Sequence, residues 1–298
     1  MNGFLNINKP AGMSSAAVVG VLKRLTGEKR IGHAGTLDPE AAGVLPIMLG
    51  RATRLFDYLV DKEKEYVTVC AFGTATDTQD ATGSVTASGE DYPTPERVRE
   101  ALPALTGDIR QKPSVYSAIK VGGRRLYDLA RKGEAAEAPE RTVHVERIDY
   151  LGGEPDHGAR LRVRCGRGTY IRSLCDDLGR LCGCPAHMRS LVRTRSGFFA
   201  LEEALDLEEA RGLAAEGRLG EKLIPMDAPI RHLGRMDAPE ELAKRVAAGA
   251  RLPLERMRGE APAEGGVTRV YLEDHFWGIA ERDGEELSWR AQMPPDAP

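Results

Sequence analysis

Residues 32–46 read GHAGTLDPEAAGVLP, a stretch with a sharp loop at its centre and apolar residues at its end. Glycine and proline flank Asp38 and disfavour regular secondary structure there. Residues Ser14 to Thr26 have the spacing of an amphipathic helix, and the apolar run Val44 to Leu49 follows the loop. Packed elements on both sides would hold the Asp38 carboxylate still. An Asp-Pro pair also begins many ordinary turns, so the spacing alone leaves a structural turn equally open.

The bulk composition of the 298 residues is that of a soluble protein, with 41% hydrophobic and 29% charged residues. The N-terminus lacks the basic start and apolar centre of a signal peptide, and no apolar run is long enough to span a membrane. We therefore expect a cytoplasmic protein with reduced cysteines. Cys182, Cys184 and His187 form the one cluster that suggests a metal, but their spacing matches no standard zinc pattern. The sequence predicts no metal.

The net charge of −3 hides a strong segregation of charge along the chain. Residues 108–132 carry seven basic and two acidic residues, and residues 160–195 carry nine arginines and two aspartates. Residues 133–159 carry seven acidic residues and two arginines. Segregated charge is compatible with a phosphate-binding face, although most charge runs are only solvated surfaces.

The secondary-structure pattern predicts an α+β fold with a mixed, largely antiparallel sheet flanked by helices. Strands are expected at residues 66–72, 143–148, 160–165 and 187–195, and helices are expected to begin after Thr94 and to span residues 169–182. Strict alternation at residues 160–165 places three arginines on one face. Two prolines near residue 225 mark a boundary, which predicts a large domain over residues 1–225 and a small one over residues 226–298.

The loop and four further segments resemble, in the same order, the motifs of the bacterial tRNA pseudouridine-55 synthases. The continuous stretch Gly32 to Pro46 carries the strongest resemblance. The other segments, over about two thirds of the chain, are Asn8-Lys9-Pro10-Ala11-Gly12-Met13-Ser14-Ser15, Lys64-Glu65-Tyr66, Pro113-Ser114-Val115-Tyr116-Ser117-Ala118-Ile119-Lys120 and Gly168-Thr169-Tyr170-Ile171-Arg172-Ser173. Five ordered motifs are far more specific than one short pattern.

The resemblance implies an isomerase with the pseudouridine synthase fold that converts uridine-55 in the T-loop of tRNA to pseudouridine. It implies a tRNA partner that binds through its T-arm, no protein partner and no cofactor, because the reaction exchanges neither electrons nor phosphate. The tail would be a small PUA-like, β-rich RNA-binding domain. Two alternatives remain: a guide-RNA-dependent synthase with the same catalytic core, and an RNA chaperone that opens the tRNA elbow, with modification secondary. An Asp38→Asn variant tests the chaperone, because a chaperone would keep its effect on tRNA folding without any chemistry.

The resemblance also implies roles for particular residues. Asp38 would either act at C1′ of the ribose, as in glycosidases, or add to C6 of the base, and the sequence does not choose between them. Arg172 would pair with Asp38, and Tyr66 would stack on the uracil and lie where the C5 proton leaves. The remaining substrate-binding residues are expected to be His33, Tyr170, Leu191 and, as a phosphate contact, Lys120. Asp80 matches a frequently acidic position without an evident role.

Two other classes of RNA-modifying enzyme do not fit. A methyltransferase needs a glycine-rich nucleotide loop, but Ile171 stands where the third glycine after Gly166-Arg167-Gly168 would be. A zinc deaminase needs His-x-Glu and Pro-Cys-x-x-Cys patterns, which are absent around His33 and Pro185.

Overall fold

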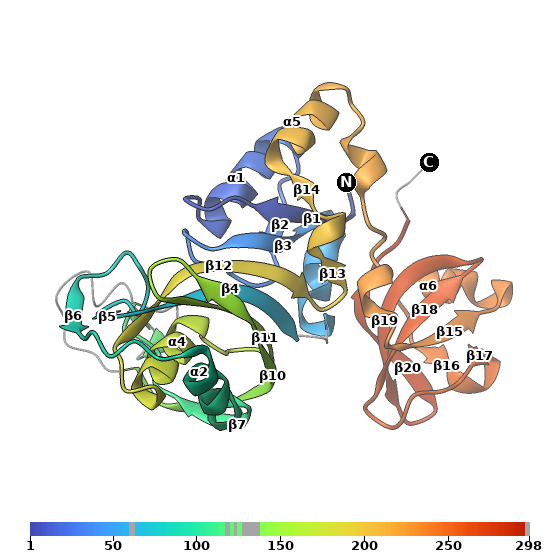
Figure 1. The fold of residues 1–298 in the computed structure, drawn as a ribbon. Helices are drawn as coiled ribbons and strands as arrows, with labels where there is room; N and C mark the ends of the chain where they lie inside the picture. Colours follow the sequence, from blue (N-terminus) through green and yellow to red (C-terminus); the bar gives the residue numbers. More distant parts are fainter. Residues whose placement is uncertain (60–62, 117–119, 122–123, 127–137, 296–298) are drawn as a thin grey trace.

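The computed structural model describes residues 1–59, 63–116, 120–121, 124–126 and 138–295. Within these ranges, ten strands form one large mixed sheet and six strands near the C-terminus form a second sheet (Figure 1). The α+β prediction is therefore confirmed, as is a β-rich C-terminal part. In the described ranges, no helix has the length and apolar character that crossing a bilayer requires.

The large sheet has the strand order β14-β1-β3-β12-β4-β11-β10-β7, with β2 paired to β3 and β13 paired to β12. Most neighbours are antiparallel, but β1–β14 and β3–β12 are parallel. The strands are β1 (Gly3–Lys9), β2 (Ile31–His33), β3 (Ala42–Leu49), β4 (Lys64–Phe72), β7 (Gly107–Gln111), β10 (Arg141–Glu154), β11 (Gly158–Cys165), β12 (Ala186–Ser196), β13 (Phe199–Ala200) and β14 (Leu205–Asp206). Two short hairpins, β5 (Thr74–Thr76) with β6 (Val85–Ser88) and β8 (Lys120–Val121) with β9 (Arg124–Arg125), lie outside it.

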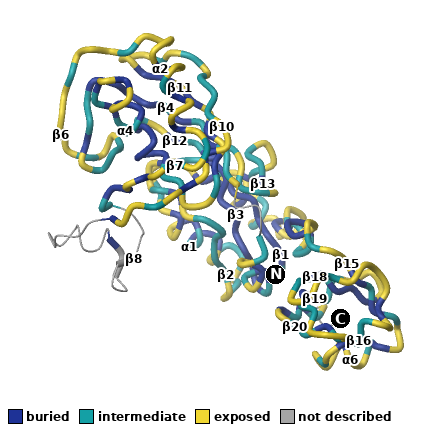
Figure 2. The backbone as a smooth tube through the Cα atoms, turned by 90° about the horizontal axis from the view of Figure 1, so that it is seen from below, coloured by how far each residue is buried: buried dark blue, intermediate teal, exposed yellow. Residues whose placement is uncertain are grey.

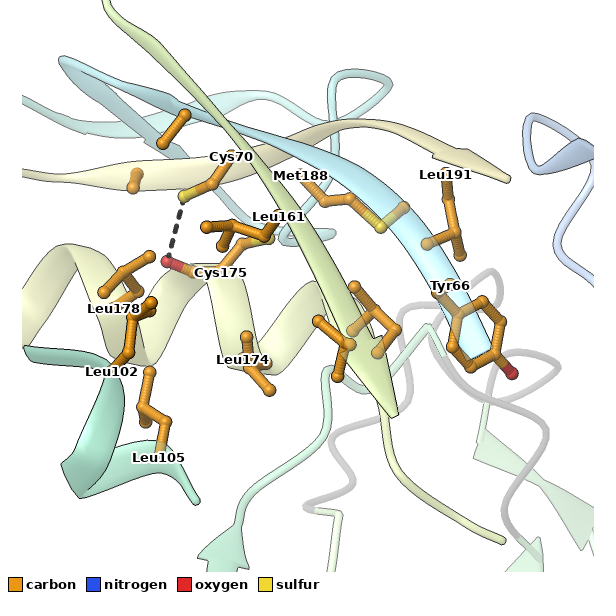
Figure 3. Close-up of a cluster of buried hydrophobic side chains, with 14 of the residues drawn as sticks. Tyr66, Cys70, Leu102, Leu105, Leu161, Leu174, Cys175, Leu178, Met188 and Leu191 are labelled. Carbon is orange, nitrogen blue, oxygen red and sulfur yellow. Dashed lines mark hydrogen bonds between the residues drawn. The ribbon is translucent and has the colours of Figure 1, made fainter. Parts of the chain in front are cut away.

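Helices cover the large sheet in two places and bury separate cores. Helix α1 (Ser15–Thr26) and helix α5 (Leu207–Ala215) pack on β1 and β3, where Leu5, Ile7 and Leu22 are buried. Helix α4 (Ile171–Leu181) and helix α2 (Pro95–Ala101) cover β4, β11 and β12. Figure 3 shows this second core, in which Leu174 and Leu178 of α4 face Cys70 and Leu161 of the sheet. The cysteines pack as small apolar groups there, since all five are buried and free.

Local signals placed these helices correctly. Ser14 caps α1 by accepting the amide of Ala17, and Thr94 caps α2 by accepting the amide of Arg97, with proline at the first helical position. The apolar residues of α4 recur at helical spacing and are buried against the sheet. The 3₁₀ segments that complete the connections are η1 (Gly50–Tyr58), η2 (Leu102–Leu105), η3 (Leu201–Glu203), η4 (Leu219–Lys222) and η5 (Ala228–Ile230).

The C-terminal sheet has the order β16-β20-β19-β18-β15-β17 and lies beside the large sheet (Figures 1 and 2). Its elements are β15 (Gly234–Ala238), η6 (Glu240–Leu242), α6 (Ala243–Ala247), β16 (Leu252–Pro253), η7 (Leu254–Arg256), β17 (Arg258–Gly259), β18 (Val267–Leu272), β19 (His275–Asp283) and β20 (Glu286–Gln292). Ile279 and Ala291 of this sheet, together with Met293 just after β20, share a buried cluster with Phe4 and Phe199 of the large sheet. The two sheets are therefore joined through a common apolar interface.

Candidate active site

The loop between β2 and β3 holds Asp38 in place through contacts on both sides of it. The hydroxyl of buried Ser15, at the start of α1, accepts the Leu37 amide at 2.9 Å and donates to the Leu37 carbonyl at 3.0 Å. The ammonium of Lys9 donates to the Pro39 carbonyl at 2.9 Å. Because the backbone is fixed immediately before and after Asp38, its side chain projects from a rigid turn.

Lys9 is a fully buried cation, and in the described ranges its ammonium hydrogen-bonds only to backbone carbonyls. Its ammonium also donates to the carbonyls of Pro10 and Met13. Burial lowers the pKa of Lys9 to about 8, while the nearby Glu40 and Asp38 carboxylates oppose that change. Lys9, which belongs to the first of the five motifs, thus supports the backbone of the Asp38 loop.

Arg193, on β12, is a second fully buried cation and holds the other end of the loop. Its guanidinium donates to the carbonyls of Val44 at 2.7 Å and Gly35 at 3.0 Å. Burial lowers the pKa of Arg193, and the adjacent Tyr66 opposes that change. The strand backbone also comes close here: a Cβ on Gly43 would lie 2.2 Å from the Arg193 carbonyl oxygen. Only glycine fits at that point.

Arg193 is the site residue that the sequence reasoning missed, because it was counted only within a basic cluster. A signal was available: Leu191 and Arg193 are two positions apart on one strand, so their side chains share its buried face. A cation on an inward face needs buried acceptors, and the loop carbonyls provide them.

Arg172 pairs with Asp38 from the first turn of α4. Its Nε lies 3.0 Å from Oδ2 of Asp38, and its side chain is only 6% exposed, whereas that of Asp38 is 42% exposed. The two terminal nitrogens donate to the carbonyls of Thr78 and Tyr116 at 3.0 and 3.1 Å. These contacts fix the guanidinium, so the more exposed carboxylate is oriented by a rigid partner.

Asp80 lies in the same network, at 3.8 Å between its Oδ2 and Nη1 of Arg172. Its other oxygen accepts the hydroxyls of Thr78 and Thr82 at 2.7 and 2.6 Å. Asp80 therefore lies beside Nη1 of Arg172, whereas Asp38 pairs with Nε, and this gives the acidic position the structural explanation that the sequence lacked.

A cavity of about 240 Å³ opens in front of the ion pair. Its walls combine one carboxylate, one guanidinium, two tyrosine rings and aliphatic groups; they include Asp38, Tyr66, Tyr170, Arg172 and Leu191. The structure thus brings together five residues from four separate segments of the sequence. The cavity is smaller than pockets for drug-sized ligands, which enclose about 300–1,000 Å³, and it suits a single nucleoside unit.

The structure does not place the two other expected substrate-binding residues in the wall of this cavity. His33 is on β2 and does not line this cavity. Burial, followed by the charge of Arg193, lowers the pKa of His33, and its buried Nδ1 has no hydrogen-bond partner among the described residues. Lys120 begins β8, but its side chain lies outside the described part of the structure. Its role as a phosphate contact stays a prediction.

Cys182, Cys184 and His187 are the cluster at which the sequence predicts no metal. Both cysteines are buried, and Nδ1 of His187 lies 2.9 Å from the Thr74 carbonyl oxygen. Across the described ranges, no group of three histidine, cysteine or acidic side chains is arranged to hold a metal ion.

Tyr66 is 7% exposed, and burial raises its pKa to about 12, so its hydroxyl is protonated at neutral pH. Tyr66→Phe keeps the ring and removes this hydroxyl. We expect unchanged RNA affinity and a single-turnover rate lower by about 10²-fold or more, because the protonated hydroxyl relays the C5 proton by releasing its own as it accepts that one. Tyr150→Phe, on β10, is the matched control and should keep the wild-type rate. Full activity of Tyr66→Phe would leave the tyrosine only a stacking role.

Sequence comparison finds close relatives over most of the chain. A protein of Bacillus licheniformis named tRNA pseudouridine synthase B is 43% identical over 84% of this chain and 82% of its own length. A protein of the same name from Dehalococcoides mccartyi is 40% identical over 97% of this chain and 95% of its own length.

Solved structures agree on the fold. The chain superposes on a protein in a Cbf5-Nop10-Gar1 complex with a TM-score of 0.71 and 26% identity, covering 94% of this chain and 78% of the other. A chain from an H/ACA RNP bound to a substrate RNA containing 2′-deoxyuridine gives a TM-score of 0.74 at 24% identity, over 99% of this chain and 86% of that one.

Two family models match most of the chain that precedes the C-terminal sheet. Residues 23–171 match the N-terminal domain of the TruB family pseudouridylate synthases, and residues 172–231 match the C-terminal domain of tRNA pseudouridylate synthase B. The first match contains Asp38, Tyr66 and Tyr170, and the second begins at Arg172. The chain therefore belongs to the TruB family of pseudouridylate synthases.

Proposed function

We propose that this protein converts uridine-55 in the T-loop of tRNA to pseudouridine. The observation that carries the proposal is the Asp38–Arg172 ion pair at a nucleoside-sized cavity walled by Tyr66 and Tyr170. The relatives at 40–43% identity, all named tRNA pseudouridine synthase B, support tRNA as the substrate.

The reaction breaks the bond between N1 of uracil and C1′, turns the ring and rejoins it through C5 with loss of the C5 proton. Asp38 supplies the carboxylate, either at C1′ or at C6 of the ring. Arg172 fixes the carboxylate, and the rings of Tyr66 and Tyr170 confine the base while it turns. Since the product is an isomer of the substrate, no electron or phosphate donor enters the balance.

A uridine in a folded loop has to leave the base stack before it reaches Asp38. The cavity is open to solvent on the side where Asp38 is 42% exposed, so an extruded nucleotide has access. The T-arm of tRNA is the proposed partner, recognised by loop shape and by unstacked bases.

We place the catalytic domain at residues 1–225 and an RNA-binding, PUA-like domain at residues 226–298. The C-terminal sheet of six strands from β15 to β20 is compatible with this division. A location in the cytoplasm follows from the proposed substrate, because tRNA is modified there.

A guide-RNA-dependent synthase is the second candidate, favoured by the superposition on the Cbf5 complex at 26% identity. The relatives named tRNA pseudouridine synthase B are closer, at 40–43% identity over most of the chain. An RNA chaperone that opens the tRNA elbow, with modification secondary, is the remaining alternative.

The test is pseudouridine formation in an unmodified tRNA transcript by the purified protein, with no guide RNA added. We expect one modification, at position 55, detected by carbodiimide-dependent primer extension. A transcript with cytidine at position 55 is the control. Modification only after a guide RNA is added would favour the second candidate, and tight binding without modification would favour the chaperone.

A further inference from the structure

Gln111, the last residue of β7, is a fully buried polar side chain. It does not line the cavity in front of the Asp38–Arg172 ion pair, which we call the catalytic cavity. β7 is the edge strand of the large sheet and pairs with β10 (Figure 1). Ile109 and Gln111 are two positions apart, so they share one face of β7, and Ile109 packs against the core beneath α4. A buried amide needs hydrogen-bond partners, and those of Gln111 indicate its role.

Both partners of the Gln111 amide belong to the backbone of Tyr170. Its Oε1 accepts the Tyr170 amide at 3.0 Å, and its Nε2 donates to the Tyr170 carbonyl at 3.2 Å. Because a backbone amide can only donate and a carbonyl can only accept, the two contacts also determine which end of the Gln111 amide is the oxygen. Gln111 thus fixes the backbone of Tyr170 much as a neighbouring β-strand would.

Tyr170 lies at the point where an extended loop turns into α4. Its φ and ψ of −104° and 110° are extended, while its carbonyl also accepts the amide of Leu174 in the first turn of the helix. Serine, threonine or asparagine usually occupies such a capping position, and here tyrosine does. Gln111 therefore supplies, from a distant strand, hydrogen bonds that fix the backbone at the helix start.

The backbone held in this way carries a ring that lines the catalytic cavity. Arg141 is directly opposite Gln111 in the β7–β10 ladder, and Cζ of its guanidinium lies 5.6 Å from the centre of the Tyr170 ring. Residues directly opposite each other on antiparallel strands have their side chains on the same face. One facing pair at the edge of the sheet therefore contacts both the backbone and the ring of Tyr170.

We propose that Gln111 is a positioning residue for catalysis, which holds the Tyr170 ring where that ring confines the uracil as it turns. This proposal rests on the proposed function, because it assumes that uracil is detached and rejoined in the catalytic cavity. The detached base can rejoin only when its C5 faces C1′, so the wall that limits its turn affects the rate. A displaced Tyr170 ring would slow this step and leave the contacts that bind the rest of the RNA in place.

Gln111→Met removes both hydrogen bonds with little change in side-chain volume. We expect the single-turnover rate at saturating tRNA to fall by about 10- to 100-fold, since a misplacement of about 1 Å can cost 10²-fold. Affinity for tRNA should stay within about threefold, as for a change that acts on the rearrangement and not on binding. Asp108→Asn is the control on β7: Asp108 is exposed and contacts His144 on β10, and its change should affect neither quantity.

A double-mutant cycle distinguishes this role from a general weakening of the fold. Tyr170→Ala removes the ring and keeps the backbone groups that Gln111 contacts. If Gln111 acts through the ring, Tyr170→Ala should lose at least as much rate as Gln111→Met, and the double variant should be no slower than Tyr170→Ala. Rates are expressed per enzyme-bound tRNA and unfolding midpoints are measured for each variant, so that an unfolded fraction is not counted as a slow rate.

The outcomes separate the two proposals. If the wild type modifies tRNA but Gln111→Met keeps its rate, or if the losses from Gln111→Met and Tyr170→Ala multiply, the inference fails alone. If Tyr170→Ala keeps the wild-type rate, the ring has no part in the turn of the base, and the inference fails even where Gln111→Met does not fold. If the wild type modifies no tRNA, the proposed function fails and the inference fails with it.

Discussion

Asp38→Asn is expected to lower the single-turnover rate of pseudouridine formation by more than about 10⁴-fold, the scale seen when a reacting carboxylate or nucleophile is removed. Asparagine has nearly the same shape, so the Ser15 and Lys9 contacts to the loop backbone remain. We therefore expect wild-type affinity for tRNA and an unchanged unfolding midpoint. The rate is measured by tritium release from C5-labelled tRNA.

Glu40→Gln is the matched control for this variant. Glu40 is an exposed carboxylate two positions further along the same loop, and its loss should change the rate by less than about threefold. A rate for Asp38→Asn within tenfold of the wild type would contradict the catalytic role. A loss of affinity equal to the loss of rate would make Asp38 a binding residue instead.

Arg172→Lys is expected to lower the turnover rate by about 10²–10³-fold while tRNA affinity stays within about threefold. Lysine keeps the charge but cannot contact Asp38, the Thr78 carbonyl and the Tyr116 carbonyl together, as the buried guanidinium does. Asp38 then loses its fixed direction, and misplacement of a reacting group by about 1 Å can cost 10²-fold. Single-turnover rates and filter binding measure the two quantities.

Arg180→Lys is the control on the same helix. Arg180 is exposed and pairs with Asp176 and Asp177 on α4, so the change should affect neither rate nor affinity. If Arg172→Lys kept the wild-type rate, the ion pair would have no part in catalysis. If it lost affinity but kept its rate at saturating tRNA, Arg172 would be a phosphate contact.

Elements with strong local patterns could be predicted from the sequence. The amphipathic spacing at residues 14–26 predicted α1, and the alternation at residues 160–165 predicted β11 with its arginines outward. The same alternation does not predict which residues those arginines contact. Arg164 lies 2.9 Å from Glu65 on the neighbouring β4, so part of the expected phosphate-binding face is already neutralised. Pairing across strands depends on register, which periodicity does not contain.

The candidate site divides in the same way. The sequence, through its ordered motifs, determined the residue types: Asp38 on a sharp loop, Arg172 at a helix start, and Tyr66 on a strand. Only the tertiary structure decided that Asp80 lies beside Arg172, that Lys9 and Arg193 lie buried behind the loop, and that a buried glutamine on β7 holds the start of α4. The physical reason is that local pattern depends on near neighbours in the chain, whereas burial and charge pairing depend on how distant strands and helices pack.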